Sequence, residues 1–238
     1  MQAVILAAGT ASRLRPLTEN CPKCLLKIKG QTLLERTIDA IIRTGITEIT
    51  IVTGYKAEMI KEFVTERYSS LKFHFIHNEQ YATTNNIFSL WLAQPQVDGR
   101  DFLLMDSDIY CEAALIQEIA SQQVSALAVE RHELGEEEMK VVTDDDGNIV
   151  EISKTCDAKT AMGESVGVEL IKANYSTALY RELETMCGKE GLENTFYELA
   201  FQRLIAKGYH FKVVDTTHFR SMELDTVEDF NRAQTIEI

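Results

Sequence analysis

Basic side chains gather in one short stretch of a chain that is otherwise acidic. The whole chain of 238 residues has 24 Lys+Arg against 37 Asp+Glu, a net charge of −13. Residues 13–29 contain only one acid, Glu19, and five basic residues, so their local charge is 5 − 1 = +4. The five basic residues are Arg13, Arg15, Lys23, Lys27 and Lys29.

A run of small residues, Gly9 to Ser12, precedes this basic segment and follows the apolar residues 3–8, which are typical of a parallel strand buried on both faces. Small side chains let backbone N–H groups approach a phosphate closely. The forked guanidinium of Arg13 can grip phosphate oxygens, and Lys23 adds a mobile charge. The pattern favours a phosphate-binding loop over the alternative, a solvated basic surface beside a structural turn.

Carboxylates occur at two distant places that could meet this loop. Asp106 and Asp108 follow the apolar residues 102–105, and Glu223 and Asp225 alternate near the end of the chain. Carboxylates at a strand end suit the oxygen coordination of Mg²⁺. The alternatives are a solvated turn at 106–108 and a helix cap at Asp225 or Thr226.

The sequence excludes or disfavours four other kinds of site. The glycines of a dinucleotide fingerprint are missing, because Ala11 and Leu14 take two of the three positions, and no Gly-Lys-Ser/Thr of a Walker loop occurs. Cys21 and Cys24 have C-x-x-C spacing, but no second cysteine pair or nearby histidine completes a zinc site, which leaves redox chemistry as the minor alternative. Residues 144–147 lack the ligand pattern of a calcium loop and indicate a hairpin turn.

The elements that must position these residues alternate between strands and helices. Strands are expected at about 3–8, 46–52, 71–76 and 102–105, with helices at about 32–44, 57–68 and 85–93. The first helix would carry Leu34, Ile38 and Ile42 on its buried face. In the second half we expect strands near 125–129, 140–143, 149–152, 166–171, 210–214 and 219–224. Helices are expected there at about 174–187, 193–207 and from 226.

This order predicts an α/β fold, a Rossmann-like three-layer sandwich with a central, mostly parallel mixed sheet and a small antiparallel extension. We expect one domain, 1–238, whose halves 1–110 and 111–238 bind nucleotide and acceptor respectively. The acidic balance argues against a nucleic-acid partner. No apolar run near the start reaches the roughly 20 residues of a membrane span. An odd number of cysteines, five, argues against a disulfide framework. These features favour a cytoplasmic protein that acts on something small.

The segment 6–26 resembles the signature of the nucleotidyltransferase family that activates phosphorylated sugars and alcohols. The resemblance rests on residues 6–9 (LAAG), Arg13 and the pair Pro22-Lys23. It implies Mg²⁺ bound by Asp108 and Asp225, and catalytic roles for Arg13, Lys23, Asp108 and Asp225. Asp106 would be a supporting group. The chain departs from the family at Ala11, where glycine is usual.

Residues 85–90 resemble a stretch of bacterial phosphocholine cytidylyltransferases and their inositol-phosphate and aminoethylphosphonate relatives, which implies CTP, or else another NTP, as the donor. The nucleotide-binding residues would then be Ala8, Gly9, Thr10, Ala11, Ser12, Arg13, Lys23, Tyr81, Asn86, Ser89 and Asp106.

The acceptor is the least defined part of the prediction. Trp91 is expected in the core, and Glu136–Met139 stands about where the choline enzymes place a cage tryptophan. A primary amine or hydroxyl groups could instead be bound by Glu138, Glu193, Tyr197, Glu198 and Glu223. Choline, aminoethyl, inositol and sugar phosphates stay open as acceptors. The rival functions are a sugar-1-phosphate nucleotidyltransferase, a glycosyltransferase that uses Asp106-x-Asp108, and a non-catalytic nucleotide-binding subunit.

Overall fold

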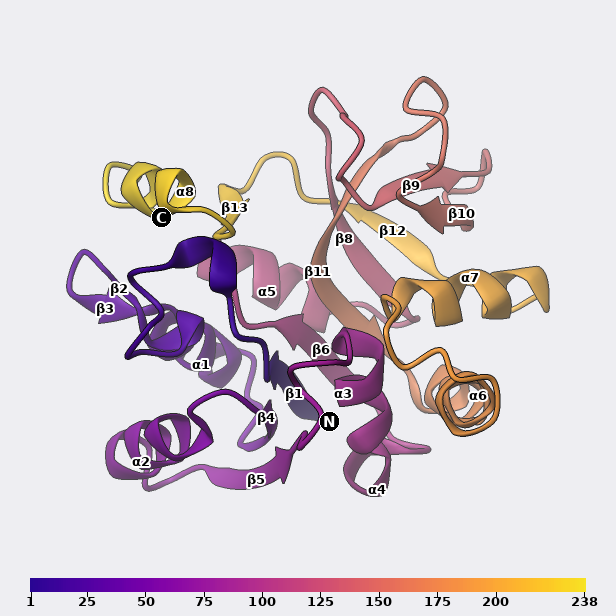
Figure 1. The fold of residues 1–238 in the computed structure, drawn as a ribbon. Helices are drawn as coiled ribbons and strands as arrows, with labels where there is room; N and C mark the ends of the chain where they lie inside the picture. Colours follow the sequence, from indigo (N-terminus) through magenta and orange to yellow (C-terminus); the bar gives the residue numbers. More distant parts are fainter.

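A mixed sheet of nine strands runs through the centre of the molecule in the computed structural model, which describes residues 1–238 (Figure 1). Its strand order is β10-β9-β11-β6-β1-β4-β5, and β8 pairs with both β11 and β12. The parallel half comprises β1 (Gln2–Ala7), β4 (Glu48–Thr53), β5 (Lys72–His77) and β6 (Phe102–Asp106). β1 is buried along its whole length, as its unbroken apolar sequence predicts.

The other half of the sheet is the antiparallel extension. It comprises β8 (Ala126–Glu130), β9 (Lys140–Thr143), β10 (Ile149–Ser153), β11 (Gly163–Ile171) and β12 (Lys212–Asp215). The long strand β11 joins the two halves, because it runs antiparallel to β6 on one side and to β8 and β9 on the other. The expected mixed sheet with an antiparallel extension is therefore confirmed.

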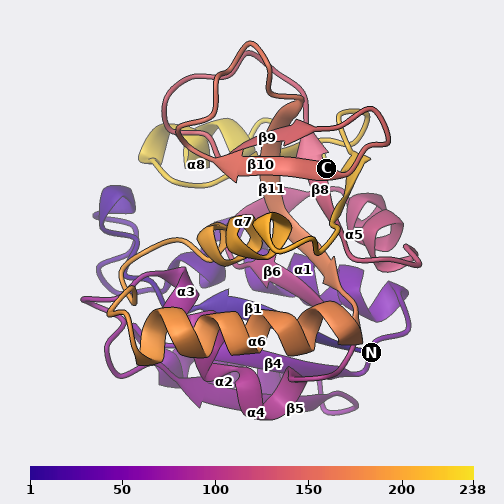
Figure 2. The same ribbon diagram turned by 90° about the vertical axis from the view of Figure 1, so that its right-hand side faces the viewer.

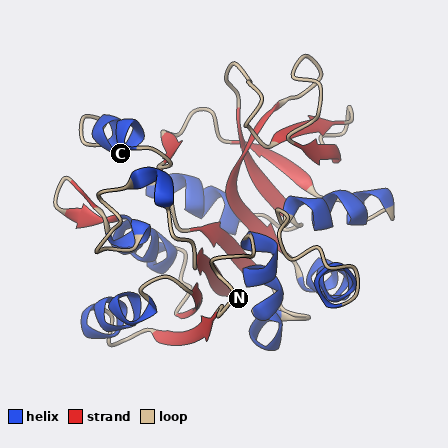
Figure 3. Cartoon of the chain, in the orientation of Figure 1, coloured by secondary structure: helices blue, strands red, loops and turns tan.

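Helices cover both faces of the sheet and make the expected three layers (Figures 2 and 3). One face carries α1 (Leu33–Arg43), α2 (Ala57–Arg67) and α5 (Ala113–Ala120). The other face carries α3 (Asn86–Leu92), α4 (Gln94–Val97), α6 (Ala173–Gly188) and α7 (Glu198–Ala206). Each face has its own apolar core, of 23 and 28 buried residues respectively. None of these helices combines the length and apolar character needed to cross a bilayer.

Short elements complete the chain near the edge where the catalytic residues are expected. Single 3₁₀ turns span η1 (Ser12–Leu14) and η2 (Lys23–Leu25). Two small ribbons pair β2 (Lys27–Ile28) with β3 (Gln31–Thr32), and β7 (Ile109–Cys111) with β13 (Ser221–Glu223). The last helix is α8 (Val227–Ala233). The β7–β13 ribbon brings the C-terminal segment beside the end of β6, although about 115 residues separate them in sequence.

Several expected elements differ from the structure in their ends or faces. In α1, Ile41 is buried, whereas Ile42 is 40% exposed, so the expected buried face was wrong by one position. The expected helix 193–207 begins only at Glu198, because residues 193–197 form turns and bends rather than helix. The helix α5 was not expected; it buries Leu115, Ile116 and Ile119 and exposes Gln117 and Glu118.

The topology creates a place for a ligand between β1 and β6. From β1 the chain proceeds outward to β4 and β5, and then returns to β6 on the other side of β1. The connections after β1 and β6 therefore diverge at the carboxyl ends of these strands. Ligands of open α/β sheets bind at such a switch point, and the small-residue loop and Asp106–Asp108 both lie there.

Candidate active site

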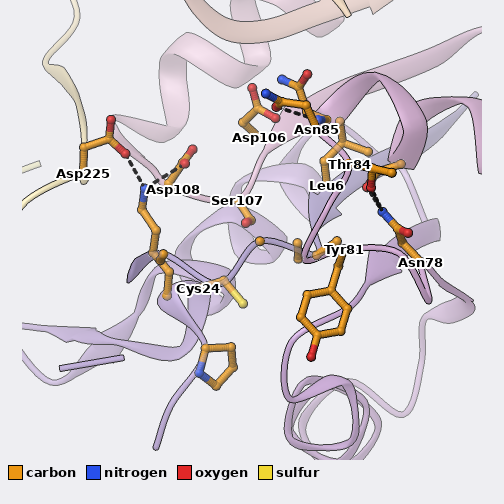
Figure 4. Close-up of a pocket in the computed structure, with 18 of the residues that line it drawn as sticks. Leu6, Cys24, Asn78, Tyr81, Thr84, Asn85, Asp106, Ser107, Asp108 and Asp225 are labelled. Atoms are coloured by element: carbon orange, nitrogen blue, oxygen red, sulfur yellow. Dashed lines mark hydrogen bonds and ion pairs between the residues drawn. The ribbon is translucent and has the colours of Figure 1, made fainter. Parts of the chain in front are cut away.

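A cavity of about 330 Å³ opens at this switch point (Figure 4). We call it the first cavity. Its walls come from the loop after β1, the 3₁₀ turn η2, the start of α3, the end of β6 and the segment after β13. Of the expected nucleotide-binding residues, nine line it, and Thr10 and Ser12 do not; the nine are Ala8, Gly9, Ala11, Arg13, Lys23, Tyr81, Asn86, Ser89 and Asp106.

The loop after β1 presents its backbone to the first cavity. A Cβ atom at Gly9 would have no neighbour within 4 Å, so the backbone there faces open space. Ala11 has φ 46° and ψ 50°, a left-handed conformation that favours glycine. The backbone at this position therefore suits the glycine that is usual in the family, although this chain has alanine. Thr18 Oγ1 donates a hydrogen bond of 2.9 Å to the carbonyl of Ala11 and so fixes the loop.

The expected catalytic residues meet at the edge of the first cavity. Lys23 Nζ lies 2.9 Å from Asp108 Oδ2 and 2.9 Å from Asp225 Oδ1, and Arg13 Nη2 lies 2.5 Å from Asp225 Oδ2. In Figure 4, the side chains of Asp108 and Asp225 converge on this shared ammonium group. The two acids, 117 positions apart in sequence, therefore lie side by side.

Electrostatics keep this group of residues charged. Burial alone would lower the pKa of Lys23, but the carboxylates of Asp108 and Asp225 outweigh it and raise that pKa. Burial would likewise raise the pKa of Asp225, but Lys23 and Arg13 outweigh it and lower that pKa. The site thus holds a fixed ammonium and a fixed carboxylate at neutral pH.

Oxygen atoms of Asp108, Glu223 and Asp225 could hold a divalent cation. One oxygen from each lies within 4.8 Å of the others. Asp108 Oδ1 is buried and has no hydrogen-bond partner, which a metal ion would satisfy. Carboxylate oxygens are the donors that Mg²⁺ prefers, so the residues present fit that ion. Burial, with Asp108 and Asp225 adding to it, raises the pKa of Glu223 to about 8.

Asp106 belongs to a separate buried network. The Tyr197 hydroxyl lies 3.1 Å from Asp106 Oδ2 and 3.1 Å from Glu169 Oε1, and its one proton serves only one of the two carboxyls at a time. Burial, followed by neighbouring carboxylates, raises the pKa of both acids well above the usual range. In Figure 4, Asp106 lies apart from the pair Asp108 and Asp225.

A bulge in β11 leaves room for Asp106. The register of β11 against β8 shifts between Ser165 and Glu169. Within this bulge Gly167 has φ +75°, and a Cβ atom there would lie 3.0 Å from Asp106 Oδ2. The glycine in this bulge therefore leaves space for the Asp106 carboxyl group, and bulges are common beside active sites.

The opposite wall of the first cavity comes from the turn before α3 and its first residues. Asn78 Nδ2 donates 3.1 Å hydrogen bonds to Thr84 Oγ1 and Ser89 Oγ. Asn86 Oδ1 accepts a 3.1 Å hydrogen bond from the backbone N–H of Tyr197. The last contact joins the start of α3 to the start of α7, which come from the two halves of the chain.

A second cavity of about 340 Å³ adjoins the first and shares seven lining residues with it. Of the expected acceptor-binding residues, it is lined by Glu138, Glu198 and Glu223. Tyr197 is buried beneath it and contributes through Asp106. Glu193 lines neither cavity, and only its backbone carbonyl takes part, by accepting a hydrogen bond from the N–H of Asn85.

Several residues at the site were missed in the sequence. Glu169 carried a signal, because it interrupts the apolar run 166–171 of a central strand. Asn78, Lys154, Glu164 and Phe196 carried none, since they lie in loops or strand ends of ordinary composition.

Three features that were not predicted to bind ligand behave as ordinary structure. Cys21 and Cys24 are both free thiols, and burial raises the pKa of Cys24 to about 12. Trp91 packs against the larger core, and its Nε1 donates to Glu184. The backbone N–H groups of Asp146 and Asn148 donate to Asp144 Oδ1 in the turn between β9 and β10, as the hairpin interpretation predicted.

Comparisons with known proteins agree with this geometry. The family model described as Nucleotidyl transferase matches residues 2–149. Choline-phosphate cytidylyltransferase of Streptococcus pneumoniae is 36% identical over 110 residues, 46% of this chain and 45% of that protein. CMP-5'-(3-aminopropyl)phosphonate synthase of Streptomyces rubellomurinus is 33% identical over 132 residues, 55% of this chain and 21% of that protein. The matched part of this chain thus spans less than half the length of these curated relatives.

A solved structure of CTP:phosphocholine cytidylyltransferase from Streptococcus pneumoniae has the same fold. It superposes with a TM-score of 0.84 and 24% identity, and the match covers 98% of this chain and 97% of that chain. The expected resemblance, which singled out the phosphocholine cytidylyltransferases, is therefore confirmed. Because the family model matches well over half of its residues, the chain belongs to the nucleotidyl transferase family.

Proposed function

We propose that this protein transfers the cytidylyl group of CTP to a small phosphorylated alcohol or phosphonate, a phosphocholine-like acceptor, and releases pyrophosphate. The observation that carries this proposal is the meeting of Arg13 and Lys23 with Asp108 and Asp225 at the border of two adjoining cavities. One cavity offers space for the nucleotide and the other for the acceptor, so the phosphates of both would lie at this border.

The reaction needs no protein nucleophile. A phosphate or phosphonate oxygen of the acceptor attacks the α-phosphorus of CTP and forms a new P–O bond. The bond from the α-phosphorus to the oxygen that bridges to the β-phosphorus breaks, and pyrophosphate leaves with that electron pair. A phosphomonoester has a second pKa of about 6, so the attacking oxygen is already largely ionised at pH 7. Catalysis then consists of positioning and of stabilising charge.

The residues of the first cavity supply those two contributions. Lys23 and Arg13 hold the triphosphate and place positive charge where the leaving pyrophosphate develops negative charge. Backbone N–H groups of Ala8, Gly9 and Ala11, which line the cavity, would bind the phosphates in the open space beside Gly9. Asp108 and Asp225 would hold Mg²⁺, which supplies charge neutralisation between nucleotide and acceptor when bound.

The rest of the first cavity would hold the nucleoside. Tyr81, Asn86 and Ser89 line its far wall, and Asp106 stands between this wall and the second cavity. Residues 1–110 would accordingly bind nucleotide, and residues 111–238 would bind the acceptor. The choice of CTP is supported by the resemblance at 85–90 and by relatives whose names contain CMP or cytidylyltransferase.

The test is a matrix of four NTPs against phosphocholine, phosphoethanolamine, 2-aminoethylphosphonate, inositol phosphate and glucose 1-phosphate, with Mg²⁺ present and pyrophosphate release as the readout. We expect CTP with a phosphorylated alcohol or a phosphonate to give the highest rate, and a chelator to abolish it. Activity only with sugar phosphates would replace the proposal by nucleotide-sugar synthesis. Release of a nucleoside diphosphate, or no turnover with any pair, would refute nucleotidyl transfer.

A further inference from the structure

The second cavity is strongly acidic. Nine acidic side chains line it against two basic ones, Arg13 and Lys154. The acidic residues are Asp106, Asp108, Glu137, Glu138, Glu164, Glu198, Glu223, Asp225 and Asp229. Acidic side chains repel the acceptor's phosphate, so the charge of this cavity is complementary to a second, cationic group on the acceptor.

Most of these acids already have partners within the protein. Asp108 and Asp225 bind Lys23, Glu164 Oε2 lies 2.8 Å from His132 Nε2, and Asp229 caps α8. Glu137 lies 3.3 Å from Lys154 Nζ. These contacts account for their presence without any ligand.

Glu198 differs from the others. It is the first residue of α7, its exposure is only 6%, and its Oε2 atom is buried without any hydrogen-bond partner. Among the acids of this cavity only Asp108 shares that last feature, and its other oxygen is bound to Lys23. A buried carboxylate oxygen without a partner is costly, because it has lost water and gained nothing in exchange. Since Glu198 lines the second cavity, a bound molecule could supply the missing donor.

No cation of the protein takes that position. Burial raises the pKa of Glu198 and the charge of Lys154 lowers it in part, yet Lys154 forms no ion pair with Glu198. Instead, Lys154 Nζ binds Glu137 and lies 4.8 Å from the centroid of the Phe196 ring. Phe196 is also the one aromatic residue among those lining this cavity. Its face is therefore in contact with an internal ammonium group.

We propose that the acceptor carries a protonated amine with free N–H bonds, as in an aminoalkyl phosphate or phosphonate, and that Glu198 Oε2 accepts a hydrogen bond from it. This inference rests on the proposed function. A trimethylammonium group has no N–H to donate and is recognised by several aromatic faces, which this cavity lacks. A primary ammonium has three donors and matches an acidic wall with an unpartnered oxygen.

The experiment compares wild type with Glu198→Gln and with Glu136→Gln, a control on the same side of the molecule whose exposed side chain lines neither cavity. Pyrophosphate release from CTP and Mg²⁺ is measured with phosphoethanolamine, 2-aminoethylphosphonate, phosphocholine and glycerol 3-phosphate. Calorimetric binding of phosphoethanolamine to each variant, with a non-hydrolysable CTP analogue present, gives a readout independent of turnover.

We expect wild type to prefer both amines over phosphocholine by at least about tenfold in kcat/KM. Glu198→Gln should lower kcat/KM for the amines by about 10- to 100-fold, mainly through KM, because a hydrogen bond to a charged group is lost. It should weaken phosphoethanolamine binding equally and leave phosphocholine and glycerol 3-phosphate nearly unchanged, and Glu136→Gln should resemble wild type.

Three outcomes would overturn the inference. A preference of wild type for phosphocholine would refute the proposed amine acceptor and leave the proposed cytidylyl transfer standing. An equal loss with all acceptors in Glu198→Gln, or no loss with any, would show that Glu198 does not bind the amine. Absence of pyrophosphate release with every acceptor would refute both this inference and the proposed function.

Discussion

The two cavities differ in charge and in how the sequence builds them. The first has two basic residues, Arg13 and Lys23, against four acids, and both basic residues stand beside a loop of exposed backbone that comes from one contiguous segment. The second is acidic and takes its walls from β11, the start of α7, the loop before β9, the residue after β10 and the segment from Glu223 to Asp229. The residues that carry the family resemblance in the first cavity are therefore close in sequence, whereas the cavity proposed to hold the acceptor is assembled from distant positions.

Removing the shared cation should have the largest effect. Lys23→Met takes away the ammonium between Asp108 and Asp225, and we expect kcat to fall by about 10³-fold, the loss that follows removal of one charged or hydrogen-bonding group from a transition-state site. Lys27→Met is the matched control, because Lys27 is an exposed lysine of the same basic segment outside both cavities. Equal turnover in the two variants would show that Lys23 has no catalytic role beyond that of any lysine in the basic segment.

The metal prediction concerns the border that both cavities share. Asp108→Asn replaces a carboxylate whose Oδ1 is buried and unpartnered, and we expect activity at 1 mM Mg²⁺, roughly a cellular level, to fall by about 10²-fold. Raising the Mg²⁺ concentration should restore part of that loss. A chelator should abolish wild-type activity. Turnover that ignores both Mg²⁺ and chelator would exclude Asp108 as a ligand.

Glu198, in the acidic cavity, should make the free energy of unfolding depend on pH. Burial raises its pKa from 4.5 in the unfolded chain to about 7. Between these pH values the unfolded chain releases the proton and the folded protein keeps it, so this group's contribution is fully present below about pH 4.5. As pH rises to about 7 this contribution is lost, and the free energy of unfolding falls by about 3 kcal/mol.

Glu198→Gln should remove this dependence. Relative to wild type, the variant should gain up to about 3 kcal/mol in the free energy of unfolding at pH 8, and little at pH 4. Urea unfolding at both pH values checks this, with Glu136→Gln as the exposed control. The same gain at pH 4 and pH 8 would mean that Glu198 does not titrate between them.

These differences also explain how far the sequence could predict the molecule. The strand–helix order and the unbroken apolar run of β1 led to the correct fold class, because their patterns are local. The convergence of Asp108 with Asp225 followed only from the family resemblance, since the β7–β13 ribbon that joins them is three residues long on each strand. Phe196 and Lys154 could not be assigned to a cavity from the sequence, because they lie in the segments before α7 and after β10, whose place in the fold depends on tertiary packing.

Gly9 tests whether the exposed backbone of the first cavity matters in itself. Gly9→Ala adds a methyl group that meets no protein atom within 4 Å and projects into the space beside the loop. We expect the stability of the protein to change by less than about 1 kcal/mol, because no strain or clash is introduced. CTP affinity should fall by about tenfold, since the methyl group keeps phosphates away from the backbone N–H groups. Calorimetry with CTP measures this, and unchanged affinity would place the phosphates elsewhere.

Ala11 gives the smallest expected effect and tests whether this chain's departure from the family carries a cost in stability. Its left-handed backbone disfavours a Cβ atom by about 1–2 kcal/mol, so replacing alanine with glycine relieves that strain. Part of the gain is lost because glycine increases the entropy of the unfolded chain. Ala11→Gly should therefore raise the free energy of unfolding by about 0.5 kcal/mol. Ala114→Gly, on an exposed position of α5, should instead lower it by about 1 kcal/mol. Opposite signs in urea unfolding would support backbone strain at Ala11, and a loss of stability in both variants would contradict it.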